Sequence, residues 1–141
     1  EIPVSAEDIL AIRALADRYS DAANRCDAKD MAAVYAEDAE LVAFGNSFRG
    51  RAAIEDVFRG TIGLMEFMNQ VCSGAVIAVD GDRATARWTV TEFAKRHDAE
   101  KLEMFMGKYE DELARGPDGW QFIRRTLSRR AQARFEATLR H

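Results

Sequence analysis

The sequence has few of the residues that most often bind metals or form cross-links, with two cysteines and two histidines in 141 residues. Cys26 and Cys72 stand alone, without the close spacing of metal ligands, and isolated cysteines are typical of a reducing compartment. We therefore expect a cytoplasmic protein. His97 lies in a predicted hairpin turn and His141 is the last residue. No Gly-rich phosphate loop occurs, so we expect no metal site and no cofactor.

Charge and the lack of long apolar runs argue against two further classes of partner. The net charge is -4, whereas nucleic-acid binding needs a basic surface. No apolar run approaches the ~20 residues of a membrane span. We expect neither partner, and the composition predicts one globular domain over residues 1–141. The sequence begins at Glu1 rather than Met, which leaves open whether a leader or tag preceded it.

The first part of the sequence carries helix signals. Ser5 is followed three residues later by Asp8, which resembles a capping box. Apolar residues then recur at three- and four-residue spacing over residues 9–26, which predicts one helix with a single apolar stripe. Asp30 is expected to cap a second, short helix over residues 31–36.

The remaining sequence predicts mostly strands. A short strand at 41–44 and a helix at 51–59 precede longer strand candidates at 67–79, 84–94, 102–113 and 120–127. Gly74 and Gly107 are expected at bulges or bends, since the apolar pattern changes phase near Gly107. This order predicts an α+β fold with helices on one side of a curved antiparallel sheet. Residues 131–141 are expected to form a C-terminal arm or a short helix.

Arg125 is the most informative residue of the last strand candidate. Alternate strand residues share a face, so Arg125 is predicted on the side of Ile123 and Leu127. A guanidinium there needs a carboxylate, a ligand or water, which suggests a pocket for a polar or anionic group. Trp120 and Phe122 are then predicted on the opposite face. Both faces should therefore be covered, which predicts a homodimer or homotrimer.

Other polar residues have two interpretations each. Asp27 is either a helix cap, worth roughly 1 kcal/mol, or a pocket carboxylate that pairs with Arg125 or acts as a base. Glu92 shares a predicted face with Trp88. It is either a pocket carboxylate with a raised pKa or a residue at a solvent-exposed strand end. Tyr19 either presents its hydroxyl to the pocket or is a core tyrosine.

The predicted pocket combines these residues. Asn69 either orients a ligand or satisfies a neighbouring backbone group. We expect the side chains of Asp27, Asn69 and Arg125 to converge on one cavity. The residues expected to line it and contact a ligand are Tyr19, Trp88, Glu92, Met104 and Phe105.

Four segments together resemble a known family. They are the first helix running to Asp27, the runs 38–41 (DAEL) and 48–54 (FRGRAAI), and 107–111 (GKYED) with the following Gly-Trp pair and Arg125. The chain to about residue 130 resembles the SnoaL-like branch of the nuclear transport factor 2-like superfamily. This resemblance implies a cone-shaped, curved antiparallel sheet closed by N-terminal helices, as in cystatin-like folds.

The resemblance is strongest to the branch that contains scytalone dehydratase and lindane dehydrochlorinase, which use an Asp-His pair as base. It implies that Asp27 matches the aspartate, Arg125 the pocket arginine and Asn69 the histidine position. Asparagine cannot take a proton at neutral pH, so the sequence departs from the family's mechanism there.

These features predict a small-molecule pocket protein. The first hypothesis is a lyase or isomerase for a mostly apolar, ring-containing substrate with one polar or anionic group, with Asp27 as base and Arg125 as polar anchor. The alternative is a non-catalytic ligand-binding or oligomerisation module that has lost the family histidine.

Overall fold

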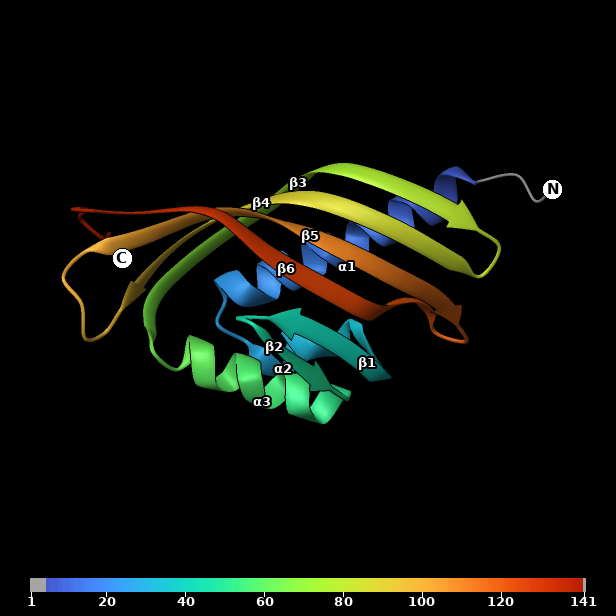
Figure 1. The fold of residues 1–141 in the computed structure, drawn as a ribbon, viewed down its shortest axis with the longest axis horizontal. Coiled ribbons are helices and arrows are strands. Elements are labelled where there is room, and N and C mark those ends of the chain that lie inside the picture. The colour runs from blue at the N-terminus through green and yellow to red at the C-terminus, as the bar shows by residue number, and fades with distance from the viewer. Residues whose placement is uncertain (1–4, 141) are drawn as a thin grey trace.

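The computed structural model describes residues 5–140 and has an α+β fold built on a curved, open sheet (Figure 1). The elements are α1 (Ala6–Asn24), α2 (Ala28–Ala33), β1 (Tyr35–Ala43), β2 (Asn46–Arg49), α3 (Arg51–Ile62), β3 (Met65–Asp80), β4 (Arg83–Arg96), β5 (Leu102–Gly116) and β6 (Gly119–Phe135). The sheet order is β2-β1-β6-β5-β4-β3. The predicted fold class is confirmed, although the sheet is mixed, because β1 and β6 run parallel.

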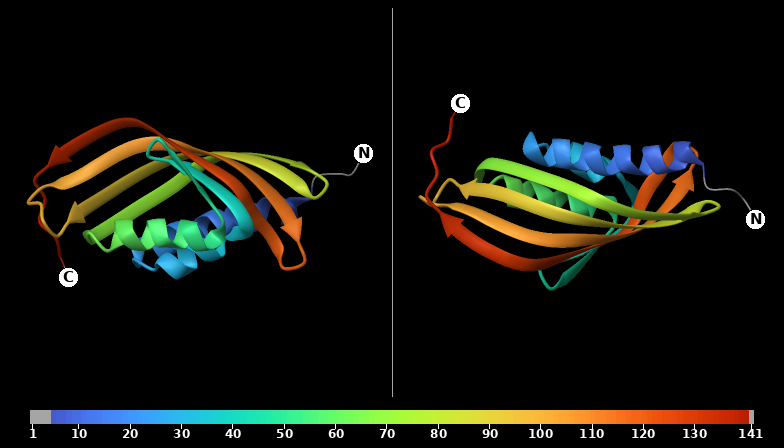
Figure 2. Two further views of the ribbon diagram at one scale, coloured as in Figure 1. Left: turned by 60° about the horizontal axis from the view of Figure 1, so that its bottom comes forward. Right: turned by 90° about the horizontal axis from the view of Figure 1, so that it is seen from above.

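The three helices cover the concave side of the sheet (Figure 2). Helix α1 begins where predicted, since the Ser5 hydroxyl accepts a hydrogen bond from the Asp8 amide at 3.1 Å. Its apolar stripe is buried against the sheet. Helix α2 begins earlier than predicted. Asp27, not Asp30, is its cap, and the Asp27 carboxylate accepts a hydrogen bond from the Asp30 amide at 2.9 Å.

Both predicted strand irregularities are confirmed. Gly74 has a φ of +64° and lies in a bulge between Ser73 and Val76 of edge strand β3. Gly107 adjoins a register shift between β5 and β6. A Cβ atom at Gly107 would collide with the Ser128 carbonyl, so only glycine lets the two backbones approach this closely.

Strand β6 differs most from the prediction. It is longer, and a bulge changes which of its residues lie on the same face of the sheet. A register shift leaves Ile123 without a partner between Phe122 and Arg124. The bulge therefore brings Phe122 and Arg125 to the same buried face. Trp120 is also buried there, and its indole donates a hydrogen bond to Asp8 of α1 at 3.2 Å. The expectation that Trp120 and Phe122 form an outer apolar face is wrong.

The C-terminal segment, residues 131–140, does not form the short helix that was one of its two predicted structures. Residues 131–135 continue β6 and pair with β5, instead of forming a short helix. Residues 136–140 have no regular secondary structure, and His141 lies outside the described residues.

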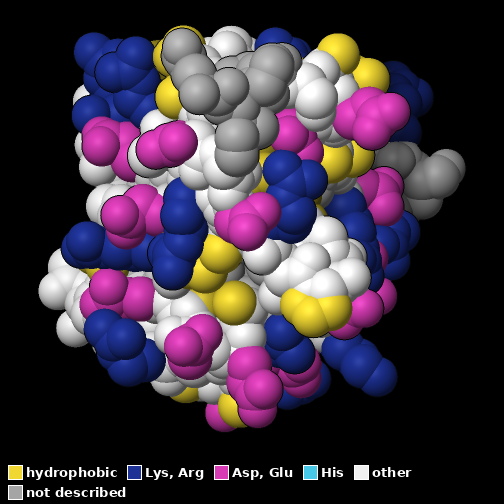
Figure 3. All heavy atoms as spheres, turned by 90° about the vertical axis from the view of Figure 1, so that its right-hand side faces the viewer, with side chains coloured by type: hydrophobic (Ala, Val, Ile, Leu, Met, Phe, Trp, Pro, Cys, Tyr) yellow, Lys and Arg dark blue, Asp and Glu magenta, His cyan; other side chains and the backbone are white. Residues whose placement is uncertain are grey.

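The surface at the right-hand side of Figure 1 mixes acidic and basic side chains without a large region of one sign (Figure 3). No helix within residues 5–140 combines the length and apolar composition that a membrane crossing requires. In the same part of the chain, no group of three or more His, Cys, Asp or Glu side chains is placed to hold a metal ion.

Candidate small-molecule cavity

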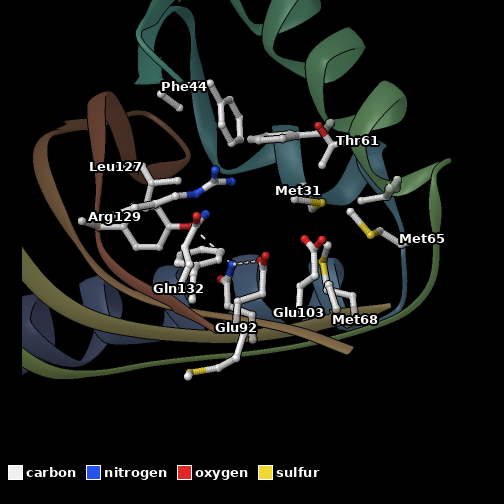
Figure 4. Close-up of a pocket in the computed structure, with 18 of the residues that line it drawn as sticks. Met31, Phe44, Thr61, Met65, Met68, Glu92, Glu103, Leu127, Arg129 and Gln132 are labelled. Atoms are coloured by element: carbon white, nitrogen blue, oxygen red, sulfur yellow. Dashed lines mark hydrogen bonds between the residues drawn. The ribbon is translucent and has the colours of Figure 1, made fainter. Parts of the chain in front are cut away.

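A cavity of about 170 Å³ lies between the concave face of the sheet and helices α2 and α3. Its wall is mostly apolar and includes Met31, Phe44, Phe58, Met65, Met68 and Phe105. The charged and amide side chains on the wall are Gln70, Glu92, Glu103, Arg129, Gln132 and Arg134. Figure 4 shows Glu92 and Glu103 rising from the sheet toward Met31 and Thr61 on the helical side. This composition suits an apolar ligand with a small number of polar groups.

Glu92 is the carboxylate best placed for chemistry in this cavity. It lies on β4 in the register that buries Trp88 and Val90 on the concave face, and its side chain is half-buried on the cavity wall. Burial raises the pKa of Glu92, while the hydrogen bond from Gln70 and the charge of Arg129 partly oppose that rise. A carboxyl with a raised pKa in an apolar site is typical of a group that accepts or donates a proton.

Gln70 holds Glu92 in place. Its Nε2 donates hydrogen bonds to Glu92 Oε1 at 3.1 Å and to the Tyr109 hydroxyl at 3.3 Å. Its Oε1 accepts a hydrogen bond from the Ser20 hydroxyl at 3.1 Å, which fixes the orientation of the amide. The backbone of Gln70 is held as well, because Asn24 at the end of α1 bonds to both its N–H and its C=O. Helix α1 therefore positions the amide that faces Glu92.

Arg125 is completely buried, but it lies behind the cavity wall rather than on it. Its Nε donates to Asp111 Oδ1 at 2.9 Å, and the Trp88 indole donates to Asp111 Oδ2 at 2.8 Å. Burial raises the pKa of Asp111 to about 6, while the charge of Arg125 and the hydrogen bonds from Trp88 and Arg125 oppose that rise. The predicted need for a carboxylate is confirmed, and Asp111 meets it, not Asp27.

Aromatic rings separate Arg125 from the cavity. Its guanidinium lies 3.6 Å from the Tyr109 ring centroid and 4.7 Å from that of Tyr19, and both of these tyrosines line the cavity. Neither its two Nη atoms nor the buried hydroxyl of Tyr35 makes a hydrogen bond of ordinary geometry within residues 5–140. Stacking on electron-rich rings is favourable for an arginine in such a place.

Asp27 and Asn69 lie elsewhere. Asp27 caps α2, pairs with Arg25 at 3.2 Å and borders a separate surface depression. Asn69 is exposed on the convex side of β3, because it alternates with the buried Gln70. The expectation that Asp27, Asn69 and Arg125 converge on one cavity is therefore wrong.

The residues expected to contact a ligand divide into two groups. Tyr19, Glu92, Met104 and Phe105 line the cavity. Trp88 is buried and is not on the cavity wall, since its indole is directed at Asp111. Tyr19 is almost fully buried, and its ring contacts the ring of Tyr109 edge to face at 6.1 Å.

Two arginines from the end of β6 lie at the cavity with different partners. Arg134 pairs with Glu103 at 3.1 Å. Arg129 instead has its guanidinium 4.8 Å from the ring centroid of Phe44 and 5.0 Å from that of Phe105. Phe44 is half-exposed and has a φ of +57° at the turn between β1 and β2. Figure 4 shows Arg129 and Leu127 on the same side of the cavity as Phe44.

Sequence reasoning missed Gln70, Asp111 and Arg129 as site or partner residues. Asp111 had a usable signal, since it alternates with Tyr109 and Leu113 on the apolar face of β5. Gln70 had none, because the strand carries apolar residues on both faces. Arg129 lies beyond residue 127, the end predicted for its strand.

The comparisons with known proteins place the chain in a family. Residues 4–126 match the model of the SnoaL-like domain family, and the chain therefore belongs to that family, as its motifs indicated. Proteins of this family bind small molecules in a pocket. No curated protein matches the chain.

Several solved structures share the fold. A candidate aromatic ring hydroxylase from Novosphingobium aromaticivorans is 24% identical, with a TM-score of 0.87 over 94% of this chain and 96% of that one. A candidate scytalone dehydratase from the same organism is 22% identical, with a TM-score of 0.85 over 94% and 90%. A hexachlorocyclohexane dehydrochlorinase is 15% identical, with a TM-score of 0.83 over 95% of each chain. At these identities the similarity establishes the shared fold.

Proposed function

We propose that the cavity binds a small, mostly apolar, ring-containing molecule and that Glu92 moves a proton in a lyase or isomerase reaction without a cofactor. The observation that carries this proposal is a half-buried carboxyl with a raised pKa, held by the Gln70 amide on the wall of an apolar cavity. Two neighbours in fold are named as a dehydratase and a dehydrochlorinase, and both names denote eliminations.

In such an elimination the Glu92 carboxylate takes a proton from a substrate carbon. The electron pair of that C–H bond becomes the new double bond, and the leaving group departs from the adjacent carbon with its bonding electrons. In an isomerisation the same carboxyl returns the proton to another carbon. Burial supports both steps, because a carboxyl with a raised pKa is a stronger base when ionised. The Gln70 amide keeps the carboxylate oriented toward the cavity.

The sequence resemblance implied a different base, Asp27, with Arg125 as polar anchor. Their positions favour other roles, a helix cap for Asp27 and a core ion pair for Arg125. We therefore assign the proton transfer to Glu92 and treat Asp27 as the control residue.

The test is turnover on a panel of halogenated and hydroxylated ring compounds, followed by loss of substrate and gain of the unsaturated product. Glu92→Gln should lower kcat by about 10²–10⁴, the usual contribution of a general acid–base group. Asp27→Asn should leave kcat within a few-fold of the wild type. If Asp27→Asn loses turnover and Glu92→Gln keeps it, the base is the one implied by the family resemblance. Turnover unchanged in both variants would contradict an acid–base role for either carboxylate.

A second candidate function is ligand binding without catalysis. The cavity wall carries two amides, Gln70 and Gln132, and no histidine of residues 5–140 is on it; His97 is exposed at the turn between β4 and β5. A protein of this kind would bind panel compounds with no turnover, and Glu92→Gln would then change affinity alone.

We also propose that the chain forms a homo-oligomer through the convex face of the sheet. Exposed apolar side chains lie there, namely Phe67, Val71, Val76 and Met106. Val71 and Met106 flank Thr91 in one row across β3, β4 and β5. Light scattering should give at least twice the monomer mass at micromolar concentration, and Val71→Lys should reduce it. A monomeric wild type would contradict this proposal.

A further inference from the structure

The cation best placed to select a ligand is Arg129. It lies on the cavity wall, and its guanidinium packs against Phe44 and Phe105 instead of a carboxylate. No ion pair of Arg129 occurs within the described part of the chain. Arg129 is exposed, and contacts with ring faces leave its N–H donors, which lie in the plane of the guanidinium, open to solvent or to a ligand. Arg129 is therefore both positioned and available for a hydrogen-bond acceptor.

Arg129 differs from the other arginines at the cavity, although its charge also acts on Glu92. Glu103 and Arg134 neutralise one another at 3.1 Å. Arg125 is enclosed behind Tyr19 and Tyr109 and is already paired with Asp111. Among the described arginines around the cavity, Arg129 is thus the one with both access and free donors.

The shape of the guanidinium defines the ligand group that it fits. Five N–H donors in a rigid plane match the two oxygens of a carboxylate, which can bind them in a bidentate manner. The Gln132 side chain also lines this part of the cavity and offers a further amide donor. The Phe44 and Phe105 rings flank the guanidinium, so the apolar part of a bound anion would lie against aromatic faces.

The size of the cavity limits the rest of the ligand. A cavity of about 150 Å³ accommodates benzene in a protein interior, and this one measures about 170 Å³. A single ring with a short side chain fits, whereas a multi-ring molecule would have to extend past Phe44 into solvent.

We propose that the cavity selects small aromatic or alicyclic carboxylates, with the ligand carboxylate bound by Arg129 and the ring among the aromatic and methionine side chains. This inference rests on the proposed function for its site. It goes further by naming the substrate class and by assigning the anchor to Arg129 instead of Arg125.

The test compares carboxylates with their neutral amides by titration calorimetry at pH 7. The probe pairs are benzoate and benzamide, phenylacetate and phenylacetamide, and cinnamate and cinnamamide. In each pair the ring is the same, so the ratio of the two Kd values isolates the contribution of the charged group. The wild type should bind at least one carboxylate ten-fold or more tightly than its amide.

Variants assign this preference to one residue. Arg129→Gln should abolish the preference while leaving the Kd of the amide within about three-fold. Arg134→Gln is the matched control, because it removes a neighbouring cation that already has a carboxylate partner, and it should keep the preference. A wild type without preference, or without binding to any pair, would overturn the inference. So would Arg129→Gln retaining the preference.

These outcomes are separable from those of the proposed function. The calorimetric ratio depends on Arg129 and needs no turnover, whereas the turnover test depends on Glu92. If Glu92→Gln loses turnover while Arg129→Gln keeps the carboxylate preference, the proton-transfer proposal stands and the carboxylate inference falls. The reverse pattern leaves a carboxylate-binding protein without catalysis at Glu92.

Discussion

The half-buried carboxyl of Glu92 lowers the stability of the folded protein at neutral pH, and a single substitution should remove this effect. Burial raises its pKa above the ordinary value of 4.5. A group whose pKa is higher in the folded than in the unfolded state contributes stability that is complete below the unfolded value. That contribution is lost as pH rises through the folded value. The ionised carboxylate therefore destabilises the folded protein at neutral pH, and Glu92→Gln should be the more stable protein there.

The size of the effect follows from the same linkage. Each unit by which a pKa is raised corresponds to about 1.4 kcal/mol once the group is fully ionised. The substitution keeps the side-chain length and an oxygen that can accept the hydrogen bond from Gln70 Nε2. We expect equal free energies of unfolding within about 0.5 kcal/mol at pH 4, and at pH 8 a gain for Glu92→Gln of about 1.4 kcal/mol for each unit by which the pKa of Glu92 is raised. Urea unfolding followed by circular dichroism and tryptophan fluorescence measures both values.

Glu103→Gln is the control for this experiment. Glu103 also lines the cavity, but its side chain is 41% exposed and pairs with Arg134. Its substitution removes a partner of Arg134 and should bring no gain in stability as pH rises. A difference between wild type and Glu92→Gln that is flat from pH 4 to pH 8 would refute the reasoning, as would a difference that favours the wild type at pH 8.

Three further predictions concern the close approach of strands at Gly107, the residue beside Glu92, and proton uptake on ligand binding. Gly107→Ala should lower the free energy of unfolding by about 1–3 kcal/mol because its Cβ would collide with the neighbouring strand. In contrast, Gly60→Ala in α3 meets open space and should raise stability by up to about 1 kcal/mol; equal urea midpoints for the two variants would contradict this. Gln70→His should raise turnover on the substrate panel, because an imidazole there would lie beside Glu92 and can accept a proton near neutral pH. Asn69→His should not, since Asn69 is exposed, and a higher kcat for Asn69→His would show that the convex side takes part. Carboxylate binding should be accompanied by proton uptake, because the added negative charge raises the pKa of Glu92 further. Calorimetry in buffers of different ionisation enthalpy should detect this uptake in the wild type but not in Glu92→Gln, and affinity should fall as pH rises through the affected range.

The architecture could be predicted because several local signals agreed with it. The Ser5 cap, the apolar stripe of α1 and the phase change near Gly107 each have a single structural solution, and the structure contains all three. The side of the sheet on which Glu92 lies was also predictable, since β4 alternates small or apolar residues with polar ones along most of its length.

Site geometry was harder to predict because it depends on which face of a strand is buried. On β3, Phe67 and Val71 beside Asn69 are as apolar as Met68 and Cys72 beside Gln70. Alternation alone therefore cannot distinguish the two faces. The convex side in fact retains Val71 at 53% exposure. The packing of α1, through hydrogen bonds with Asn24 and Ser20, holds the face that carries Gln70 toward the core.

Bulges were the second obstacle. The bulge at Ile123 reverses the alternation within β6. Phe122 and Arg125 therefore share a face, although residues three positions apart in a regular strand lie on opposite faces. No glycine or proline marks this bulge in the sequence.

The cap of α2 was also hard to predict. Asp27 and Asp30 are equally plausible caps by residue type, and only the backbone of the turn after α1 decides between them.

The bulge at Gly74 has a consequence for how copies of this chain meet in solution. Strand β3 is a free edge of the sheet, and an uninterrupted edge of its length would be a template for another chain's backbone. The bulge between Ser73 and Val76 breaks the regular spacing of N–H and C=O groups near the middle of that edge. An incoming strand can therefore align with one half of β3 but not with both in the same register. Replacing Gly74 with a residue that favours regular strand geometry would lengthen the exposed template and make the protein more prone to aggregate.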